Sequence, residues 1–253
     1  MGVEPEESVG LKMSKLFGKK LVELAGISED DFVLDIGTGL GPVFFSALTR
    51  VSKRGHIVGI DVSDEMVKGT RAGLKRCRLP NAAIIKSDAK SLVFRDSTFD
   101  VVLSGFSYVY SSLKEVLRVL RKDGLFGLSS WSALGDMNCM AEFVKKYLPI
   151  SVEDVCHHDT PEALKTLLLK AGFSEVRVFV ETQEFVFKDE EQWWEEMLSS
   201  GWQTHLAKIE DQSFSLGEFK QETFKGLQKH KRTDGIPFII SAILALATKS
   251  RSA

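Results

Sequence analysis

Residues 33–41 read VLDIGTGLG, a short apolar run that leads straight into three closely spaced glycines. Pro42 follows at once, and residues 42–51 have the composition of a helix. Glycine is needed where the backbone turns tightly and where a ligand must approach the main chain. The stretch therefore predicts a strand, a ligand-binding turn and a helix in direct succession.

Short apolar runs alternate with amphipathic segments over most of the chain. This alternation predicts a parallel sheet covered by helices on both faces. The expected strands are 32–36, 56–60, 82–86, 99–103, 125–129, 175–180 (extending toward 187) and 239–248, and the expected helices are 11–24, 42–51, 64–77, 112–120 and 161–171.

Acidic residues follow the second and third of these strands. Asp61 stands about twenty residues beyond the glycines, where a carboxylate can accept hydrogen bonds from a ribose diol. Asp88 and the Ala89 N–H can read the edge of an adenine. A dinucleotide enzyme would instead require GxGxxG, but here the third glycine comes one residue early and Pro42 has no N–H to offer a pyrophosphate.

With these motifs, the sequence resembles the class I S-adenosylmethionine-dependent methyltransferases, in particular the branch around ubiquinone and menaquinone C-methyltransferases and other small-molecule methyltransferases. The resemblance covers most of residues 20–180. The expected fold is α/β, with a Rossmann-like, seven-stranded, mostly parallel sheet and helices on both faces, and the resemblance implies that the last strand is antiparallel. The helical insertion 188–235 is expected to form a lid together with the N-terminal helix. The segments that carry the resemblance are VLDIGTGLG (33–41), IVGIDVSDEMV (57–67), SDAKSLVFRDSTFDVVLSGF (87–106), EVLRVLRKDGLFGLSSW (115–131) and TPEALKTLLLKAGF (160–173).

The resemblance also implies that the cofactor is S-adenosylmethionine. Gly37 and Gly39 would face its methionyl part, and Asp35 would help to fix their loop. Asp61 would hold the ribose, and the Ser104 carbonyl would receive the methionyl amine. The full set of expected cofactor-binding residues is Asp35, Gly37, Thr38, Gly39, Gly41, Asp61, Val62, Ser87, Asp88, Ala89, Ser104 and Phe106.

The expected catalytic residues are Tyr108, Tyr110 and His157. The tyrosines follow strand four, near the expected place of the methyl acceptor, although this loop is shorter than in many relatives. His157 is a candidate general base, and a solvated loop before a helix is the alternative. His205 offers the same chemistry in a later segment. No metal site is predicted, because histidines and cysteines lack the spacing of ligands.

Two further patterns leave alternatives open. Trp193, Trp194 and Trp202 either line an aromatic pocket or pack a core at helical spacing. The basic run 225–232 is a solvated face or a site for an anionic ligand.

Composition limits the class of protein. The 253 residues carry a formal net charge of −2, so nucleic acid is not an expected partner. The longest apolar stretch, 236–247, is too short for a membrane span, which needs about 20 residues. Three widely spaced cysteines and an acidic start without a signal-like apolar run favour the cytoplasm.

One methyltransferase domain over 1–253 is expected. Its parts are an N-terminal helical segment (1–32), a cofactor-binding core (33–187) with an insertion (131–159), a helical lid insertion (188–235) and a last strand (236–249). The expected reaction is in-line transfer of a methyl group to a small-molecule acceptor, which releases S-adenosylhomocysteine. The alternatives are a non-catalytic cofactor-binding or partner protein on the same fold and, less favoured, an NAD-dependent oxidoreductase.

Overall fold

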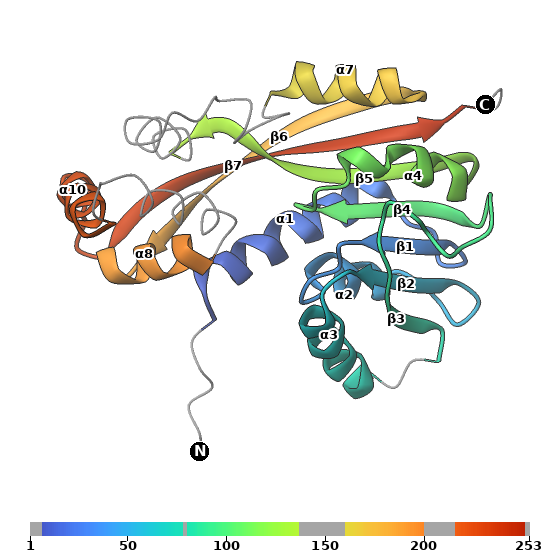
Figure 1. Cartoon of the computed structure of the whole chain (residues 1–253), viewed down its shortest axis with the longest axis horizontal. Coiled ribbons are helices and arrows are strands. Elements are labelled where there is room, and N and C mark those ends of the chain that lie inside the picture. Colours follow the sequence, from blue (N-terminus) through green and yellow to red (C-terminus); the bar gives the residue numbers. More distant parts are fainter. Residues whose placement is uncertain (1–6, 78–79, 137–159, 200–215, 251–253) are drawn as a thin grey trace. The chain divides into compact units, whose positions relative to one another are not determined.

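Figure 1 shows the computed structural model, which describes residues 7–77, 80–136, 160–199 and 216–250. His157, His205 and Trp202 lie outside these residues. The elements are, in chain order, α1 (Val9–Ala25), β1 (Phe32–Ile36), α2 (Pro42–Leu48), β2 (His56–Asp61), α3 (Asp64–Cys77), β3 (Ala82–Lys86), β4 (Phe99–Gly105), η1 (Tyr110–Ser112), α4 (Leu113–Val119), β5 (Leu120–Gly135), α7 (Pro161–Ala171), β6 (Phe173–Phe187), α8 (Glu190–Ser199), α10 (Leu216–Gln228) and β7 (Ile236–Lys249).

Seven strands form one sheet in the order β3-β2-β1-β4-β5-β7-β6. β1 pairs in parallel with β2 on one side and with β4 on the other. From β1 the chain adds β2 and β3 on one side and then returns to add β4 on the other side of β1. The strand order therefore switches at β1, and ligands bind at the carboxyl end of such a switch point in folds of this type. The predicted α/β fold with a mostly parallel sheet is confirmed.

β7 runs opposite to its neighbours in the sheet. Its last residues contact the first residues of both: Lys249 Nζ donates to the Leu120 carbonyl (2.8 Å), and Ser174 Oγ donates to the Thr248 carbonyl (3.1 Å). Figure 1 shows the arrowhead of β7 pointing away from that of β5. Residues 242–247 are all buried, as expected for a strand covered on both faces. The antiparallel last strand expected from the family resemblance is present.

The chain divides into two compact units. The larger unit comprises residues 14–131, 158–181 and 242–253, and the smaller unit comprises residues 1–13, 132–157 and 182–241. The first four strands and α2, α3, α4 and α7 belong to the larger unit, whereas α8 and α10 belong to the smaller one.

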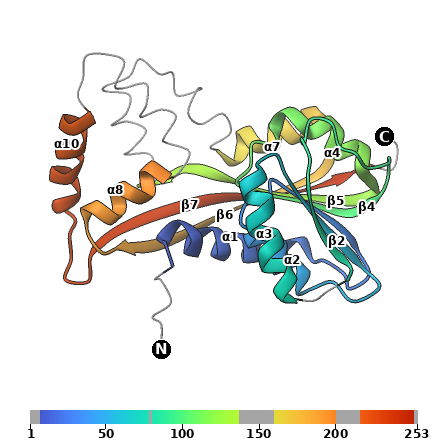
Figure 2. The same ribbon diagram turned by 60° about the horizontal axis from the view of Figure 1, so that its bottom comes forward.

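Helices cover both faces of the sheet in the larger unit. On one face, Leu34, Val102 and Phe126 join the apolar residues of α4 and α7 in one buried cluster. On the other face, α2 approaches closely, because a Cβ added at Gly105 of β4 would lie 2.6 Å from a methyl of Val43. Figure 2 shows α2 and α3 on the side of the sheet opposite to α4.

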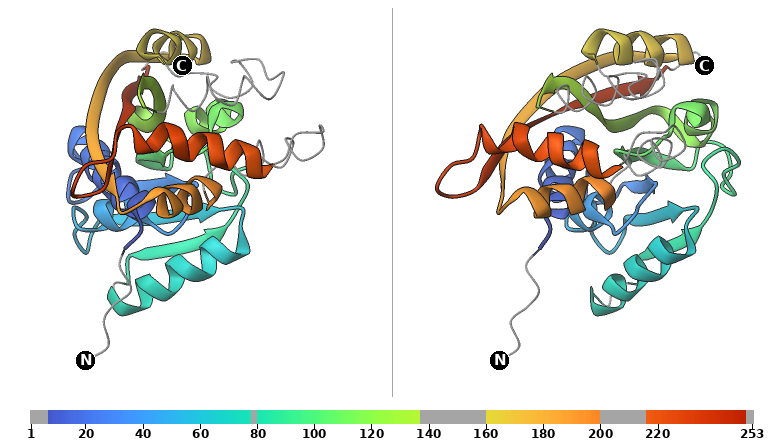
Figure 3. Two further views of the ribbon diagram at one scale, coloured as in Figure 1. Left: turned by 90° about the vertical axis from the view of Figure 1, so that its left-hand side faces the viewer. Right: turned by 60° about the vertical axis from the view of Figure 1, so that its left-hand side comes forward.

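The smaller unit has its own aromatic core, formed by side chains of α8, α10 and the start of β7. Figure 3 shows α8 and α10 next to each other. Trp193 packs edge-on against Phe238 with ring centroids 5.8 Å apart, and Trp194 lies 5.8 Å from Phe219. Both tryptophans are buried, which confirms the core-packing interpretation for this pair. The lid role expected for 188–235 stays a prediction. No helix within the described ranges is long and apolar enough to cross a membrane.

The boundaries of β5 and α2 differ from the predicted ones. β5 begins at Leu120 rather than at residue 125, because Asp123 takes a positive φ of 61° and the pairing with β4 shifts register there. The expected turn is therefore a bulge inside the strand. α2 ends at Leu48, three residues early, where the Thr49 hydroxyl donates to the Ser46 carbonyl (2.7 Å).

Candidate active site

The glycine loop after β1 is held by β2 and lies against the loop after β4. The amides of Gly37 and Thr38 both donate to the Ile60 carbonyl at 2.9 Å. Gly37 has a φ of 69°, and a Cβ there would lie 2.2 Å from Ser107 Oγ. Glycine is therefore required twice over at this position, for its backbone conformation and for the close approach of Ser107.

Asp61 at the end of β2 joins this loop to the next one. Its Oδ2 accepts the Gly39 amide and its Oδ1 accepts the Ser63 amide, each at 2.9 Å. Each carboxylate oxygen has a second lone pair, so two further donors such as ribose hydroxyls can be accepted. Val62 follows with 67% of its surface exposed, an unusual exposure for a valine beside a polar cluster.

Asp35 is the most perturbed group of the site. It is 1% exposed, and among the described residues neither carboxylate oxygen has a partner at full hydrogen-bond geometry, although the Thr38 hydroxyl and the Phe44 amide lie near enough to lower its pKa. Burial raises the pKa of Asp35 to about 7, the negative charge of Asp61 adds to the increase, and the neighbouring Thr38 hydroxyl opposes it. Thr38 is also buried, and its hydroxyl donates to the Asp35 main-chain carbonyl (3.1 Å). An uncompensated buried carboxylate is costly to the fold and is typical of a site that receives a cation.

The loop after β3 places Ser87, Asp88 and Ala89 at the same edge of the sheet. The Ser87 amide donates to the Asp61 carbonyl (3.0 Å), which ties this loop to β2. Ser87 Oγ is buried without a partner. Asp88 is exposed and uses Oδ1 to accept the Lys90 amide (2.9 Å), while Ala89 packs partly against the core.

The loop after β4 supplies the remaining predicted cofactor residues. Ser104 is completely buried, and its hydroxyl has no partner within the described part of the chain. Phe106 has a φ of 51°, and its amide donates to the Ser129 carbonyl (3.1 Å). Its ring stacks on Trp131 with centroids 4.2 Å apart. Sequence reasoning missed Ser129 and Trp131, although both stand at the carboxyl end of a predicted strand.

The three predicted catalytic residues behave differently. Tyr108 is 81% exposed, so its ring lines no enclosed pocket. Tyr110 is half-buried, and its hydroxyl shares a hydrogen bond with Ser130 Oγ (2.7 Å). His157 lies outside the described residues. The larger unit therefore brings the cofactor residues together at one edge but shows no paired acid and base there among the described residues.

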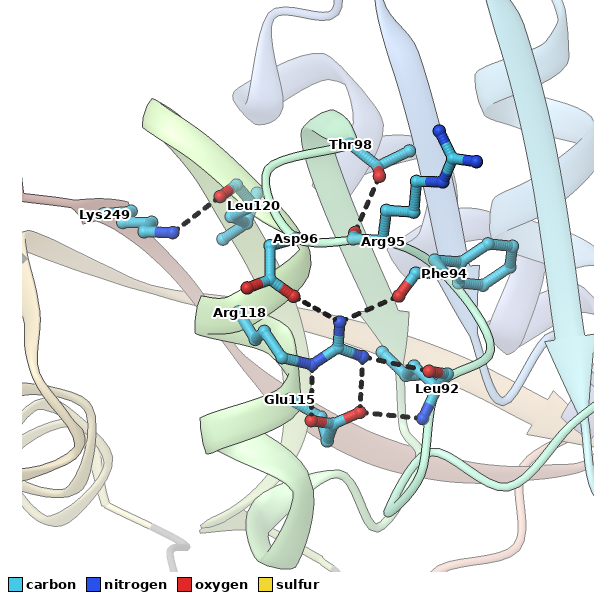
Figure 4. A network of polar contacts seen from close by, with 9 residues as sticks. All are labelled: Leu92, Phe94, Arg95, Asp96, Thr98, Glu115, Arg118, Leu120 and Lys249. Atoms are coloured by element: carbon cyan, nitrogen blue, oxygen red, sulfur yellow. Dashed lines mark hydrogen bonds and ion pairs between the residues drawn. The ribbon is translucent and has the colours of Figure 1, made fainter.

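Arg118 of α4 fastens the loop that follows Asp88, and sequence reasoning missed it. Figure 4 shows its guanidinium between the loop and Glu115. It donates to the carbonyls of Leu92 (2.9 Å) and Phe94 (2.8 Å), and it forms ion pairs with Glu115 (2.7 Å) and Asp96 (2.8 Å). Glu115 in turn accepts the Leu92 amide at 2.8 Å. Glu115 and Arg118 are three residues apart on one helix, and this spacing is the sequence signal for their ion pair.

We expect Arg118→Ala to loosen this loop. The change leaves two carbonyls and Glu115 without their charged partner, so the free energy of unfolding should fall by about 2–4 kcal/mol. Hydrogen exchange should quicken selectively at the amides of 88–98. Arg118→Lys should rescue little, because an ammonium cannot span the same fork of acceptors. Unchanged exchange in that loop would contradict the assignment.

Glu115 gives the network a defined pH dependence. The Arg118 guanidinium lowers the pKa of Glu115 from 4.5 to about 2. The folded protein therefore keeps the carboxylate ionised where the unfolded chain would protonate it, so this stabilisation is complete above pH 4.5 and is lost as pH falls toward 2. Glu115→Gln should be less stable than the natural protein at pH 7, with the difference shrinking in urea titrations below pH 4. A difference that is constant with pH would contradict the ion pair.

Comparisons with known proteins identify methyltransferases that are similar to this chain. Residues 33–124 match the family model described as a methyltransferase domain. The ubiquinone/menaquinone biosynthesis C-methyltransferase of Blochmanniella floridana is 27% identical over 191 residues, which cover 65% of this chain and 74% of the relative. The nocamycin O-methyltransferase of Saccharothrix syringae is 30% identical over 128 residues, which cover 49% of this chain and 46% of the relative.

A solved structure shares the fold. Phosphoethanolamine N-methyltransferase 2 of Haemonchus contortus, in complex with S-adenosyl-L-methionine, is similar over 93% of this chain and 53% of its own, with a TM-score of 0.57 and 16% sequence identity. At 16% identity, this similarity shows only that the two chains share a fold.

Proposed function

We propose that the chain, which is a class I S-adenosylmethionine-dependent methyltransferase, methylates a small organic acceptor. The match to a methyltransferase domain and the similarity to a named methyltransferase support this class of enzyme. The acceptor and the part played by each residue are inferred from the geometry of the larger unit.

The observation that carries the proposal is the unpartnered carboxylate of Asp35 beside the glycine loop. S-adenosylmethionine is a cation with an ammonium group at its methionyl end, and Asp35 would supply the opposite charge. Gly37 and Gly39 bring the main chain close to that end, and the buried Ser104 lies at the end of the neighbouring strand β4. A cationic ligand suits this group of residues, whereas the negative charges of a pyrophosphate would be repelled by the Asp35 and Asp61 carboxylates.

The adenosine half fits the loops after β2 and β3. Asp61 keeps lone pairs for the two ribose hydroxyls while its other lone pairs accept the Gly39 and Ser63 amides. Exposed Val62 offers an apolar face for the adenine ring. Asp88 and the Ala89 amide would then read the adenine edge, which is the role predicted for them.

Pro42 argues against an NAD cofactor. It is the first residue of α2, so the helix start lacks one of the N–H groups that a pyrophosphate would use. Gly41 before it has a φ of 88°, and a Cβ there would lie 2.6 Å from the Phe45 ring. This glycine therefore meets a packing requirement of the helix itself.

When bound, S-adenosylmethionine would supply a methyl group activated by its positive sulfur, for in-line transfer to the acceptor with release of S-adenosylhomocysteine. The residues of the chain have to orient both molecules and exclude water, and alignment contributes up to about 7–11 kcal/mol. A general base is needed only when the acceptor must lose a proton. The Tyr110–Ser130 hydroxyl pair and His157 remain candidates for that role.

The named relatives act on small molecules through different atoms. One is a C-methyltransferase of ubiquinone/menaquinone biosynthesis and one is the nocamycin O-methyltransferase. The net charge of −2 gives no sign of a nucleic acid as the substrate. We therefore infer a small organic acceptor and leave its reacting atom to experiment.

The test is turnover with S-adenosylmethionine that carries a deuterated methyl group. The acceptors are a panel of quinols, phenols, amines and thiols. The proposal predicts a product that gains one labelled methyl, together with equimolar S-adenosylhomocysteine, and no product from Asp61→Ala. Binding of the cofactor with no product from any acceptor class would favour a non-catalytic role.

A further inference from the structure

The segment that joins β3 to β4 contains both residues proposed to recognise adenine. Residues 87–98 include neither a helix nor a strand, and Asp88 and Ala89 stand near their start. The main-chain groups of such a segment find their partners in neighbouring elements rather than in regular structure of their own. The contacts of 87–98 therefore decide where Asp88 and Ala89 lie.

The first part of this segment is a closed turn. Asp88 Oδ1 accepts the Lys90 amide (2.9 Å), and the Asp88 main-chain carbonyl accepts the Ser91 amide (3.1 Å). These two hydrogen bonds make the turn one compact unit, which leads directly into Leu92. The place of the turn is thus set by what holds Ser87 before it and Leu92 after it.

Leu92 is fastened to α4 through both of its main-chain groups (Figure 4). Its amide donates to Glu115 Oε2 (2.8 Å), and its carbonyl accepts Arg118 Nη2 (2.9 Å). The same guanidinium donates to the Phe94 carbonyl (2.8 Å) and pairs with Asp96 (2.8 Å). The Leu92 side chain is buried in the same core cluster as the apolar residues of α4. Glu115 and Arg118 therefore fix the residue that directly follows the turn.

The far end of the segment is held without the Arg118 side chain. The Ser97 amide donates to the main-chain carbonyl of Arg118 (2.9 Å), and the Thr98 amide donates to that of Val119 (2.7 Å). Main-chain contacts of this kind survive a change of side chain. Loss of the guanidinium should therefore free the part of the segment next to Asp88 and leave its junction with β4 in place.

We propose that Glu115 and Arg118 are positioning residues that give the cofactor site its preference for adenine over other bases. The inference rests on the proposed function, because it takes Asp88 and the Ala89 N–H to face the adenine edge. The two α4 side chains hold Leu92 and, through it, the turn, so that carboxylate and N–H meet the base in one geometry. Hydrogen bonds weaken steeply with misalignment, so a turn that is free to shift loses the preference between bases.

Two ligands that differ only in the base test the proposal by calorimetric titration. They are S-adenosylhomocysteine and S-inosylhomocysteine, in which a carbonyl oxygen replaces the adenine amine and the neighbouring ring nitrogen carries a proton. In the same pose, the inosyl ligand can neither donate to Asp88 nor accept from the Ala89 N–H. The natural protein should therefore prefer the adenosyl ligand about 10–100-fold.

Arg118→Ala should reduce this preference to about threefold or less, mainly by weakening the adenosyl ligand, while the inosyl affinity changes about twofold at most. An unchanged preference in the variant, whether both ligands weaken together or neither does, would overturn the inference alone. A natural protein that binds neither ligand would refute the cofactor site and the inference with it. Equal binding of both ligands by the natural protein would refute adenine recognition by Asp88, on which the inference depends.

Further variants locate the effect. Arg121→Ala is the matched control, because Arg121 pairs with Asp100 (2.6 Å) near the start of β4, and it should leave the preference unchanged. Glu115→Ala should reduce the preference as Arg118→Ala does, and the double variant should lose no more than either, since both side chains act through Leu92. Circular dichroism checks that each variant is folded at the temperature of the titration. Additive losses from Glu115 and Arg118, or an equal loss in Arg121→Ala, would contradict the inference.

Discussion

Replacing Asp35 with asparagine is expected to stabilise the protein above pH 7 while it weakens the binding of S-adenosylmethionine. The buried carboxylate has a pKa raised from 3.8 to about 7, mainly by burial. The folded protein thus holds a proton that the unfolded chain has already released, so stability falls as pH rises from 3.8 through 7. An amide of the same shape carries no such charge and avoids that loss.

The stability arm of this prediction is measured by urea unfolding at pH 5.5 and pH 8. Each pKa unit corresponds to about 1.4 kcal/mol, so Asp35→Asn should be more stable by roughly 2–4 kcal/mol at pH 8. At pH 5.5 the unfolded chain has already released this proton while the folded protein keeps it, so the stability advantage of Asp35→Asn should be about 2 kcal/mol smaller than at pH 8, and it should vanish only below pH 3.8. Asp88→Asn, the same substitution at an exposed position, is the matched control.

The binding arm has the opposite sign. A cationic ligand favours the ionised carboxylate, so S-adenosylmethionine should bind the natural protein more tightly as pH rises through 7, with release of a proton. Asp35→Asn should bind about 10–100-fold more weakly at pH 8 and should lose this pH dependence. Titration in two buffers with different heats of ionisation measures the proton released. A variant that binds as tightly as the natural protein would show that Asp35 does not face the cofactor's charge.

Replacing Gly37 with alanine should disrupt the glycine loop. The new Cβ would lie 2.2 Å from Ser107 Oγ and 2.5 Å from Ser107 Cβ, and the backbone has a φ of 69°. The loop or Ser107 must move, so the free energy of unfolding should fall by about 2–4 kcal/mol and cofactor affinity should fall with it.

Two further variants separate the steric from the backbone cost. Gly26 has a φ of 61°, and a Cβ there would meet nothing within 4 Å, so Gly26→Ala measures the backbone cost alone, about 1 kcal/mol. Adding Ser107→Gly to Gly37→Ala removes the clash and should recover most of the remaining loss. Chemical denaturation of the natural protein, Gly37→Ala, Ser107→Gly and the double variant gives the cycle, and Gly26→Ala is measured beside it. Equal effects at Gly26 and Gly37 would contradict the packing of Ser107 on the loop.

The sequence predicted those features that depend on local chemistry. The glycine loop, the strand before it and the acid after β2 follow from turn geometry and from apolar patterning, and the structure brings Gly39 and Asp61 into direct contact. The bulge at Asp123 was missed, because an Asp-Gly pair reads as a turn unless the partner strand is known. The extension of β6 toward Phe187 was predicted and is present, and the strand begins at Phe173, two residues before the predicted start.

Features that depend on tertiary contacts were not predictable from local patterns. Tyr108 was expected to line a pocket, and it is exposed because Val109 takes the buried position in the short loop after β4. The Arg118 network joins α4 to a loop over twenty residues away in sequence.

The central claim is that the edge of the sheet around Asp35 and Asp61 binds S-adenosylmethionine. Calorimetric titration of the folded, cofactor-free protein with S-adenosylmethionine, S-adenosylhomocysteine and NAD tests it directly, with Asp61→Ala alongside. We predict dissociation constants of about micromolar order for the first two, a loss of at least tenfold in the variant, and no binding of NAD. Failure of both adenosyl ligands to bind, or binding of NAD in their place, would contradict the account.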